Sequence, residues 1–284
     1  MGFFDSLSKG WTFTKEALAM AKRGKLLAPS IYQVLISIAY FIVAVLVLVM
    51  IDPHWSDATW AVVSGLITFG SFLIFYFFCG VTVNMIDVHL KGGTPSFRDG
   101  VADAKKNFLA IVWLAMISAV IETFARAARN EDSIVGRILA GIVEAIWTTL
   151  AFLLLPCIII EDAGFKQAMG RVRDLHKGHL MLIGVGDVGV RAITFIIGLI
   201  WFALIFAIVF ASFSAFSTTT ALVITFVVGG GMFAAYVAFS TFLRMAYYTC
   251  LYLYAVEVEK QGVSAPAPLP LAIALGKATR PVAA

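Results

Sequence analysis

The chain has 284 residues, of which 61% are hydrophobic and only 13% are charged, and its net charge at pH 7 is +4. Ordinary soluble domains are about 45–50% apolar and about 25% charged. So few charged residues cannot cover the surface of a water-soluble fold, which excludes an ordinary soluble enzyme. We therefore predict an all-α fold, a polytopic bundle of membrane-spanning helices with lipid around most side chains.

The basic residues do not indicate a nucleic-acid partner. They lie beside the apolar runs instead of along one exposed face, which is typical of the charges that set membrane topology. Residues 1–30 are amphipathic and rich in lysine, so we expect this segment to lie in the membrane interface. No apolar stretch with a cleavage site occurs there, so a cleaved signal peptide is not expected.

Six segments are predicted to cross the membrane. Five contain the roughly 20 apolar residues that a bilayer requires. The apolar part of the other, Phe108 to Ile121, would span only about 21 Å as a helix. We infer that it crosses, because otherwise the basic segment Lys166 to Lys177 would face away from the basic N-terminus. The predicted spans are 31–51, 60–83, 108–125, 138–160, 192–211 and 221–243, which together form a domain over residues 31–260.

The distribution of basic residues predicts the orientation. Of the 21 Lys and Arg residues, only Arg126, Arg129 and Arg137 fall on the outer side when all six segments cross. Positive charge is enriched on the cytoplasmic side, so both termini are expected there, in a cytoplasmic (inner) membrane. Residues 261–284 form an Ala/Pro-rich tail, which is expected to lack fixed structure.

An amphipathic segment precedes each pair of spans, at Phe3 to Lys25, Phe97 to Lys106 and Phe165 to Lys177. Segments of this kind lie in the membrane interface. The pattern predicts three units, each an interfacial helix followed by a helical hairpin. The alternative, which we weigh equally, is that any cytoplasmic loop needs basic residues.

Several motifs resemble a family of uncharacterised bacterial multi-pass membrane proteins, a domain of unknown function. They are Gly10-Trp11 with the basic stretch from Lys22 to Pro29, the segment Ser133 to Ile142, and Leu155 to Glu161 followed by Gln167-Ala168. The resemblance covers most of residues 1–200. It implies the membrane fold and a bacterial cytoplasmic membrane, but no activity or catalytic residue.

Charged residues at membrane depth are the most informative feature. Glu122 lies near the outer end of the third span, with Arg126 one turn further out, while Glu144 lies about 10 Å beyond Arg137 in the fourth. Two antiparallel helices would bring these four residues to similar depths. We predict an ion-pair cluster that either holds two helices together or lines a polar vestibule.

A second cluster is predicted at the inner boundary. Asp187 and Arg191 are spaced i, i+4 on one helix, and Asp87 and Arg244 lie near the inner ends of two others. Long side chains can reach water from this depth, so the pattern favours a functional role less than that of the first cluster does.

Two features could bend the spans. Pro156 removes a backbone donor inside the fourth span, so a kink is expected. Gly229, Gly230 and Gly231 would loosen the last span or admit a neighbouring helix closely. Either feature could act as a gate, although packing is the commoner role.

The sequence contains no pattern that indicates catalysis, so we expect no catalytic residue, metal or cofactor. The three cysteines are widely separated within apolar runs. A G-x-G-x-x-G match at Gly184, Gly186 and Gly189 lies at the mouth of a membrane helix instead of after a strand. Small residues there permit close helix packing.

Two functions from different classes remain open. Small-solute or ion permeation is slightly favoured, because polytopic proteins with buried charges commonly move solutes. The alternative is a non-enzymatic scaffold or accessory subunit that organises partners or lipids, which the scarcity of polar residues in the spans favours. Membrane lipids, a second copy of the chain or a membrane protein are the expected partners.

Overall fold

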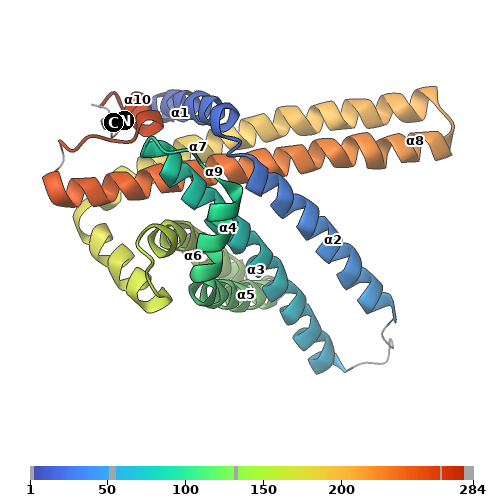
Figure 1. Cartoon of the computed structure of the whole chain (residues 1–284). Helices are drawn as coiled ribbons and strands as arrows, with labels where there is room; N and C mark the ends of the chain where they lie inside the picture. Colours follow the sequence, from blue (N-terminus) through green and yellow to red (C-terminus); the bar gives the residue numbers. More distant parts are fainter. Residues whose placement is uncertain (1–2, 51–55, 131–133, 263, 278–284) are drawn as a thin grey trace. The chain divides into compact units, whose positions relative to one another are not determined.

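The computed structural model describes residues 3–50, 56–130, 134–262 and 264–277. The side chains of residues 3–6, 23–24, 50, 57–58, 130 and 176–188 lie outside that description. The described chain is built from ten α-helices and one π-helical turn (Figure 1). Six helices are long and apolar enough to cross a membrane. The chain divides into two compact units, one formed by residues 35–178 and the other by residues 1–34 with 179–284.

The unit of residues 35–178 is a helical bundle. Its elements are most of α2 (Ala28–Met50), α3 (Asp57–Leu90), α4 (Phe97–Lys106), α5 (Phe108–Asn130), α6 (Ile134–Ile160) and the start of α7 (Phe165–Ala215). The helices α3, α5 and α6 pack against one another, and the short amphipathic α4 packs on α3. Serine side chains cap the N-termini of α3 and α4, since Ser56 Oγ accepts from Thr59 N–H and Ser96 Oγ accepts from Asp99 N–H.

A buried hydroxyl joins the three long helices of this bundle. Ser118 Oγ on α5 lies 2.9 Å from the Tyr76 hydroxyl of α3 and accepts from Trp147 Nε1 of α6 at 2.9 Å. Ser118 also donates to its own helix, at Leu114 O. In a bilayer, where water cannot satisfy buried polar groups, such a junction fixes how the helices pack.

The other unit combines a long helical hairpin with two helices at its base (Figure 1). The hairpin consists of residues 179–215 of α7 and the return path through α8 (Thr218–Ile224), the π-helical turn η1 (Thr225–Gly229) and α9 (Gly230–Gln261). Its two arms are joined where Trp201 Nε1 donates to Met232 O at 2.7 Å. Over residues 195–213 of α7 most apolar side chains are exposed, as expected of a helix that faces lipid.

The base of the hairpin is covered by α1 (Phe3–Gly24) and α10 (Leu269–Leu275). Phe13 of α1 is buried and meets Tyr247 of α9 edge-on, with 5.4 Å between ring centroids. Gly10 lies directly against the backbone of Gly189, so close that a Cβ atom at position 10 would collide with the Gly189 carbonyl. The amphipathic N-terminal segment therefore packs its apolar face on protein.

The prediction of an all-α bundle with about six membrane helices is confirmed. The doubtful third span is the first 22 residues of α5, Phe108–Arg129, which reach about 33 Å. The sequence estimate was too short because it stopped at Glu122. The helix continues through that charge and the two arginines that follow, since helix geometry tolerates charged side chains that have partners.

Two local predictions differ from the structure. The segment Phe165 to Lys177 is no separate interfacial helix but the first part of α7, which runs for 51 residues because no proline interrupts it. The tail was expected to lack fixed structure, yet it forms α10. Pro268 precedes that helix, and Leu271 and Ala272 are buried in its contact with α1 and α9.

Candidate functional site

An ion-pair cluster occupies the end of the bundle where α5 finishes and α6 begins. Arg126 Nε donates to Glu122 Oε1 at 2.8 Å, and Arg129 Nη2 reaches the same oxygen at 3.2 Å. Arg129 Nη1 also donates to Glu144 Oε2 at 2.5 Å, which joins α5 to α6. The structure thus brings three of the four predicted residues together through Arg129, which the sequence analysis had placed outside the cluster.

Arg137 does not enter this cluster among the residues that the structure describes. It lies near the start of α6, and the contact between α5 and α6 is made by Arg129 instead. The reason is helical phase, because Glu122, Arg126 and Arg129 are spaced i, i+4, i+7 and share one face of α5. The side chain of Glu144 is 38% exposed, so this cluster lies at the bundle surface and lines no enclosed vestibule.

The residues of the predicted inner-boundary cluster fall in different units. Asp87 belongs to the bundle, where Lys91 on the next turn of α3 pairs with it at 2.6 Å. Arg191 and Arg244 belong to the hairpin unit and line a cavity of about 200 Å³ with Tyr248, to whose hydroxyl Arg191 donates at 3.3 Å. The side chain of Asp187 lies outside the described residues.

The predicted flexible positions have different surroundings. Pro156 is buried, and α6 continues through it to Ile160. Gly229 ends the π-helical turn η1 and faces Ile205 of α7, whereas a Cβ atom at Gly230 or Gly231 would meet nothing within 4 Å. A Cβ atom at Gly229 would make an ordinary contact with Ile205 at 3.7 Å, so close packing requires a glycine at none of the three positions. The π-helical turn itself was not predicted. Such turns often occur at functional sites.

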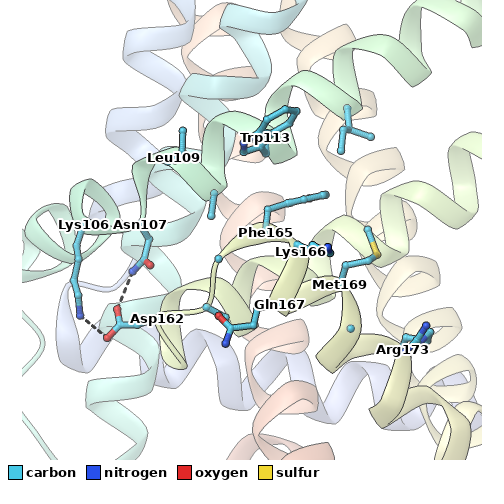
Figure 2. Close-up of a pocket in the computed structure, with 15 residues that line it drawn as sticks. Lys106, Asn107, Leu109, Trp113, Asp162, Phe165, Lys166, Gln167, Met169 and Arg173 are labelled. Atoms are coloured by element: carbon cyan, nitrogen blue, oxygen red, sulfur yellow. Dashed lines mark hydrogen bonds and ion pairs between the residues drawn. The ribbon is translucent and has the colours of Figure 1, made fainter.

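The described bundle also contains a large cleft that the sequence did not predict. It has a volume of about 1220 Å³ and lies between the start of α5 and the start of α7, across the loop that follows α6 (Figure 2). We call it the basic cleft. Its apolar wall includes Leu109, Trp113 and Ile117 of α5 with Phe165 and Met169 of α7, and its polar side chains are Lys106, Asn107, Asp162, Lys166, Gln167 and Arg173.

Asp162 ties the two sides of the basic cleft together. Lys106 donates to its Oδ2 at 2.5 Å and Asn107 Nδ2 donates to its Oδ1 at 3.0 Å. Both bonds favour the carboxylate, first that of Lys106 and then that of Asn107, and they lower the pKa of Asp162 below its ordinary value. The same ion pair raises the pKa of Lys106, so opposite charges are maintained at this corner.

A second carboxylate behind this corner has the opposite tendency. Asp103 of α4 accepts from Asn84 Nδ2 of α3 at 3.1 Å. Partial burial raises its pKa, and the hydrogen bond from Asn84 opposes that rise while the charge of Asp162 adds to it. Asp103 and Asn84 join α4 to α3 and thereby position Lys106 at the end of α4.

Sequence reasoning missed this cleft because its polar residues come from two regions far apart in the chain, the end of α4 with Asn107 and the loop after α6 with the start of α7. Lys106 and Asp162 are separated by 56 positions. The available signal was the recurrence of basic residues with aromatic neighbours after the second and fourth spans, which the analysis had assigned to interfacial helices. That pattern predicts the charges but not their convergence.

The elements described above define a polytopic α-helical membrane protein. The model of a family of unknown function, DUF6159, matches residues 58–262, so the chain belongs to that family. The match covers α3 to α9 and agrees with the predicted resemblance to an uncharacterised family. No curated protein and no solved structure matches the chain.

Proposed function

We propose that the protein is a non-enzymatic membrane scaffold or accessory subunit that organises lipids or partner proteins. One observation carries the proposal: the cavity at membrane depth in the described bundle is apolar. It has a volume of about 470 Å³ and lies between α3 and α5, where Thr123 is the single side chain with a polar group among Gly65, Leu66, Phe69, Met116, Ala119, Val120, Thr123 and Phe124. Thr123 donates to its own helix, at Ala119 O.

The polar groups of the bundle support the same conclusion. Ser118 is satisfied by Tyr76 and Trp147, so it holds helices together and offers no group to a passing solute. A permeation route needs a row of polar groups or charges that replaces the hydration shell of the solute. The charges of Glu122 and Glu144 are instead balanced by those of Arg126 and Arg129 at the bundle surface.

Flux measurements test this proposal directly. The full chain is reconstituted into liposomes that contain a potassium gradient or a trapped small anion, and release is compared with that from protein-free liposomes. We expect no added permeability, and we expect a photo-reactive residue at Phe206, an exposed position of α7, to give a discrete adduct with a protein or lipid in native membranes. Flux that changes in Glu144→Gln would overturn the proposal in favour of permeation.

We also infer that both termini face the cytoplasm. The inference is supported by the basic residues at one end of the bundle, where α3 and α6 end and α5 and α7 begin. A reporter joined after Gln261 should be active on the cytoplasmic side, and one inserted after Asn130 should be active on the opposite side. A cytoplasmic signal after Asn130 would overturn both this orientation and the crossing of α5.

A further inference from the structure

The lining of the basic cleft has a charged part and an apolar part. Lys106, Lys166 and Arg173 supply three cations and Asp162 supplies one anion, so the lining has a net positive charge. Leu109, Trp113 and Ile117 occupy successive turns on one face of α5 and continue the cleft toward the middle of that membrane helix. A ligand that fits both parts has an anionic head and a long apolar tail.

The cations of the cleft differ in how fully they are neutralised. Lys106 is engaged by Asp162 at 2.5 Å. Arg173 is 3.6 Å from Asp174, its neighbour in sequence, which is a loose contact that leaves most of the guanidinium donors free for a ligand. Lys166 forms no ion pair with any residue that the structure describes. Two cations on the first three turns of α7 are therefore available to an anion.

The helix that forms the floor of the cleft adds to this preference. The first turn of α7 begins at Phe165, directly after Gly164, and both residues line the cleft (Figure 2). The first N–H groups of an α-helix have no partner within the helix and point outward from its N-terminus, where the helix dipole favours negative charge. Lys166 lies on the same turn, so the dipole and a side chain act on one anion.

The apolar wall opens toward lipid and not toward the bundle core. Leu109 is 71% exposed and Trp113 is 47% exposed, and both belong to the membrane span of α5. Tryptophan is favoured at the boundary between headgroups and acyl chains. Figure 2 shows both residues on α5, across from the turns of α7 that carry Phe165, Lys166 and Met169. The cleft is thus continuous with the space that an acyl chain would occupy.

We propose that the basic cleft binds an anionic phospholipid, with its phosphate group held by Lys166, Arg173 and the first turn of α7 and one acyl chain along Leu109 and Trp113 of α5. Basic pockets at the ends of membrane helices recognise such headgroups through the charge of the phosphate. The inference rests on the lipid-organising part of the proposed function and names its ligand class. It assigns the site to a lipid of the leaflet that the basic end of the bundle faces.

The test measures lipid preference with the full chain in detergent. Native mass spectrometry, with a titration of phosphatidylglycerol against phosphatidylcholine, gives the ratio of the two apparent affinities. We expect Lys166→Gln or Arg173→Gln to lower that preference about fivefold each, because one basic residue near an anionic membrane surface contributes about 1 kcal/mol. Lys105→Gln removes the same charge from the last turn of α4, outside the cleft, and should leave the preference unchanged.

Two further arms separate the possible ligands. Inorganic phosphate at the same concentration should not displace phosphatidylglycerol. Leu109→Ser should weaken the binding of phosphatidylglycerol without changing the folding of the protein. Equal effects of Lys105→Gln and Lys166→Gln, or full displacement by inorganic phosphate, would overturn the site. Those results would not affect the flux measurements, so a failure of this inference is distinguishable from a failure of the scaffold proposal.

Discussion

Arg129 on α5 reaches Glu144 on α6, with 2.5 Å between Nη1 and Oε2. The same guanidinium lies 3.2 Å from Glu122, so one arginine pairs with carboxylates on both helices. Because α5 and α6 follow each other in the chain, this contact closes the end of the hairpin at which they are joined. It gives the charged residues a role in helix packing that needs no solute.

The bridging role of Arg129 predicts a difference between two arginine variants. Arg129→Gln leaves Glu144 without its bond from α5 and removes one of the two bonds to Glu122, so the thermal unfolding midpoint should fall. Arg137→Gln removes the same charge from α6 without breaking an ion pair between described residues. Unfolding monitored by circular dichroism in detergent should therefore show a clear decrease for Arg129→Gln only. Equal decreases would contradict the assignment.

The sequence predicted the number and type of the membrane helices because a bilayer permits few other structures for long apolar segments. It also predicted that Glu122 and Glu144 lie at similar depth. It did not predict that Arg129 joins them, since this depends on which face of α5 meets α6. The i, i+4, i+7 spacing of Glu122, Arg126 and Arg129 was visible, but no residue pattern fixes the rotation of one helix against another.

The basic cleft was beyond sequence reasoning for a different reason. Its corner depends on a contact between Lys106, the last residue of α4, and Asp162, in the loop that follows α6. In the sequence, each of these two regions has the pattern of an ordinary cytoplasmic loop with basic residues. The π-helical turn before Gly230 was equally hidden, because one extra residue in a helical turn leaves the apolar pattern almost unchanged.

The hydroxyl of Ser118 should be important for stability. In Ser118→Ala, the Tyr76 hydroxyl and the Trp147 indole N–H both lose their partner in the bundle, and Tyr76 is only 4% exposed. We expect a loss of about 1–2 kcal/mol in the free energy of unfolding. Ser71→Ala is the control, because Ser71 is exposed and bonds only its own helix at Ile67 O. Similar losses for both variants would exclude a special role for Ser118.

The two carboxylates near the basic cleft predict opposite dependences on pH. The pKa of Asp162 is lowered, so its contribution to stability is present above the pKa of an unfolded aspartate, about 3.9, and is lost as the pH falls through the folded value. The pKa of Asp103 is raised, so its contribution is present below about 3.9 and is lost as the pH rises through the folded value.

Asparagine variants separate these two contributions. At pH 7, Asp162→Asn should be less stable than the wild-type protein, because it weakens the bonds from Lys106 and Asn107. Asp103→Asn should be more stable, because it removes a partly buried charge and retains an oxygen that can accept from Asn84. Thermal unfolding between pH 3 and 7 measures both. Shifts of the same sign at pH 7 would contradict the assignment of at least one carboxylate.

The contact between Gly10 and Gly189 explains how α1 is held at the base of the hairpin unit. A Cβ atom at position 10 would meet the Gly189 carbonyl carbon at 2.5 Å, and a backbone atom of α7 cannot move aside as a flexible side chain can. Gly10→Ala should therefore force α1 from α7 and cost about 1–3 kcal/mol, the usual cost of overpacking. Gly231→Ala in α9 should instead stabilise by about 0.5–1 kcal/mol, because its Cβ would enter open space.

Protease protection of α1 measures this difference without an assay of function. In the wild-type protein, the burial of Phe13, Ala17 and Met20 should slow cleavage at Lys15 and Lys22, because a protease needs the helix to open. Gly10→Ala should be cleaved faster at both lysines, whereas Gly231→Ala should match the wild-type protein. If Gly10→Ala were cleaved at the wild-type rate, α1 would be held by its apolar face alone and the glycine contact would be dispensable. If Gly231→Ala were also cleaved faster, the glycines of α9 would stabilise the base of the hairpin without packing closely against a neighbouring helix.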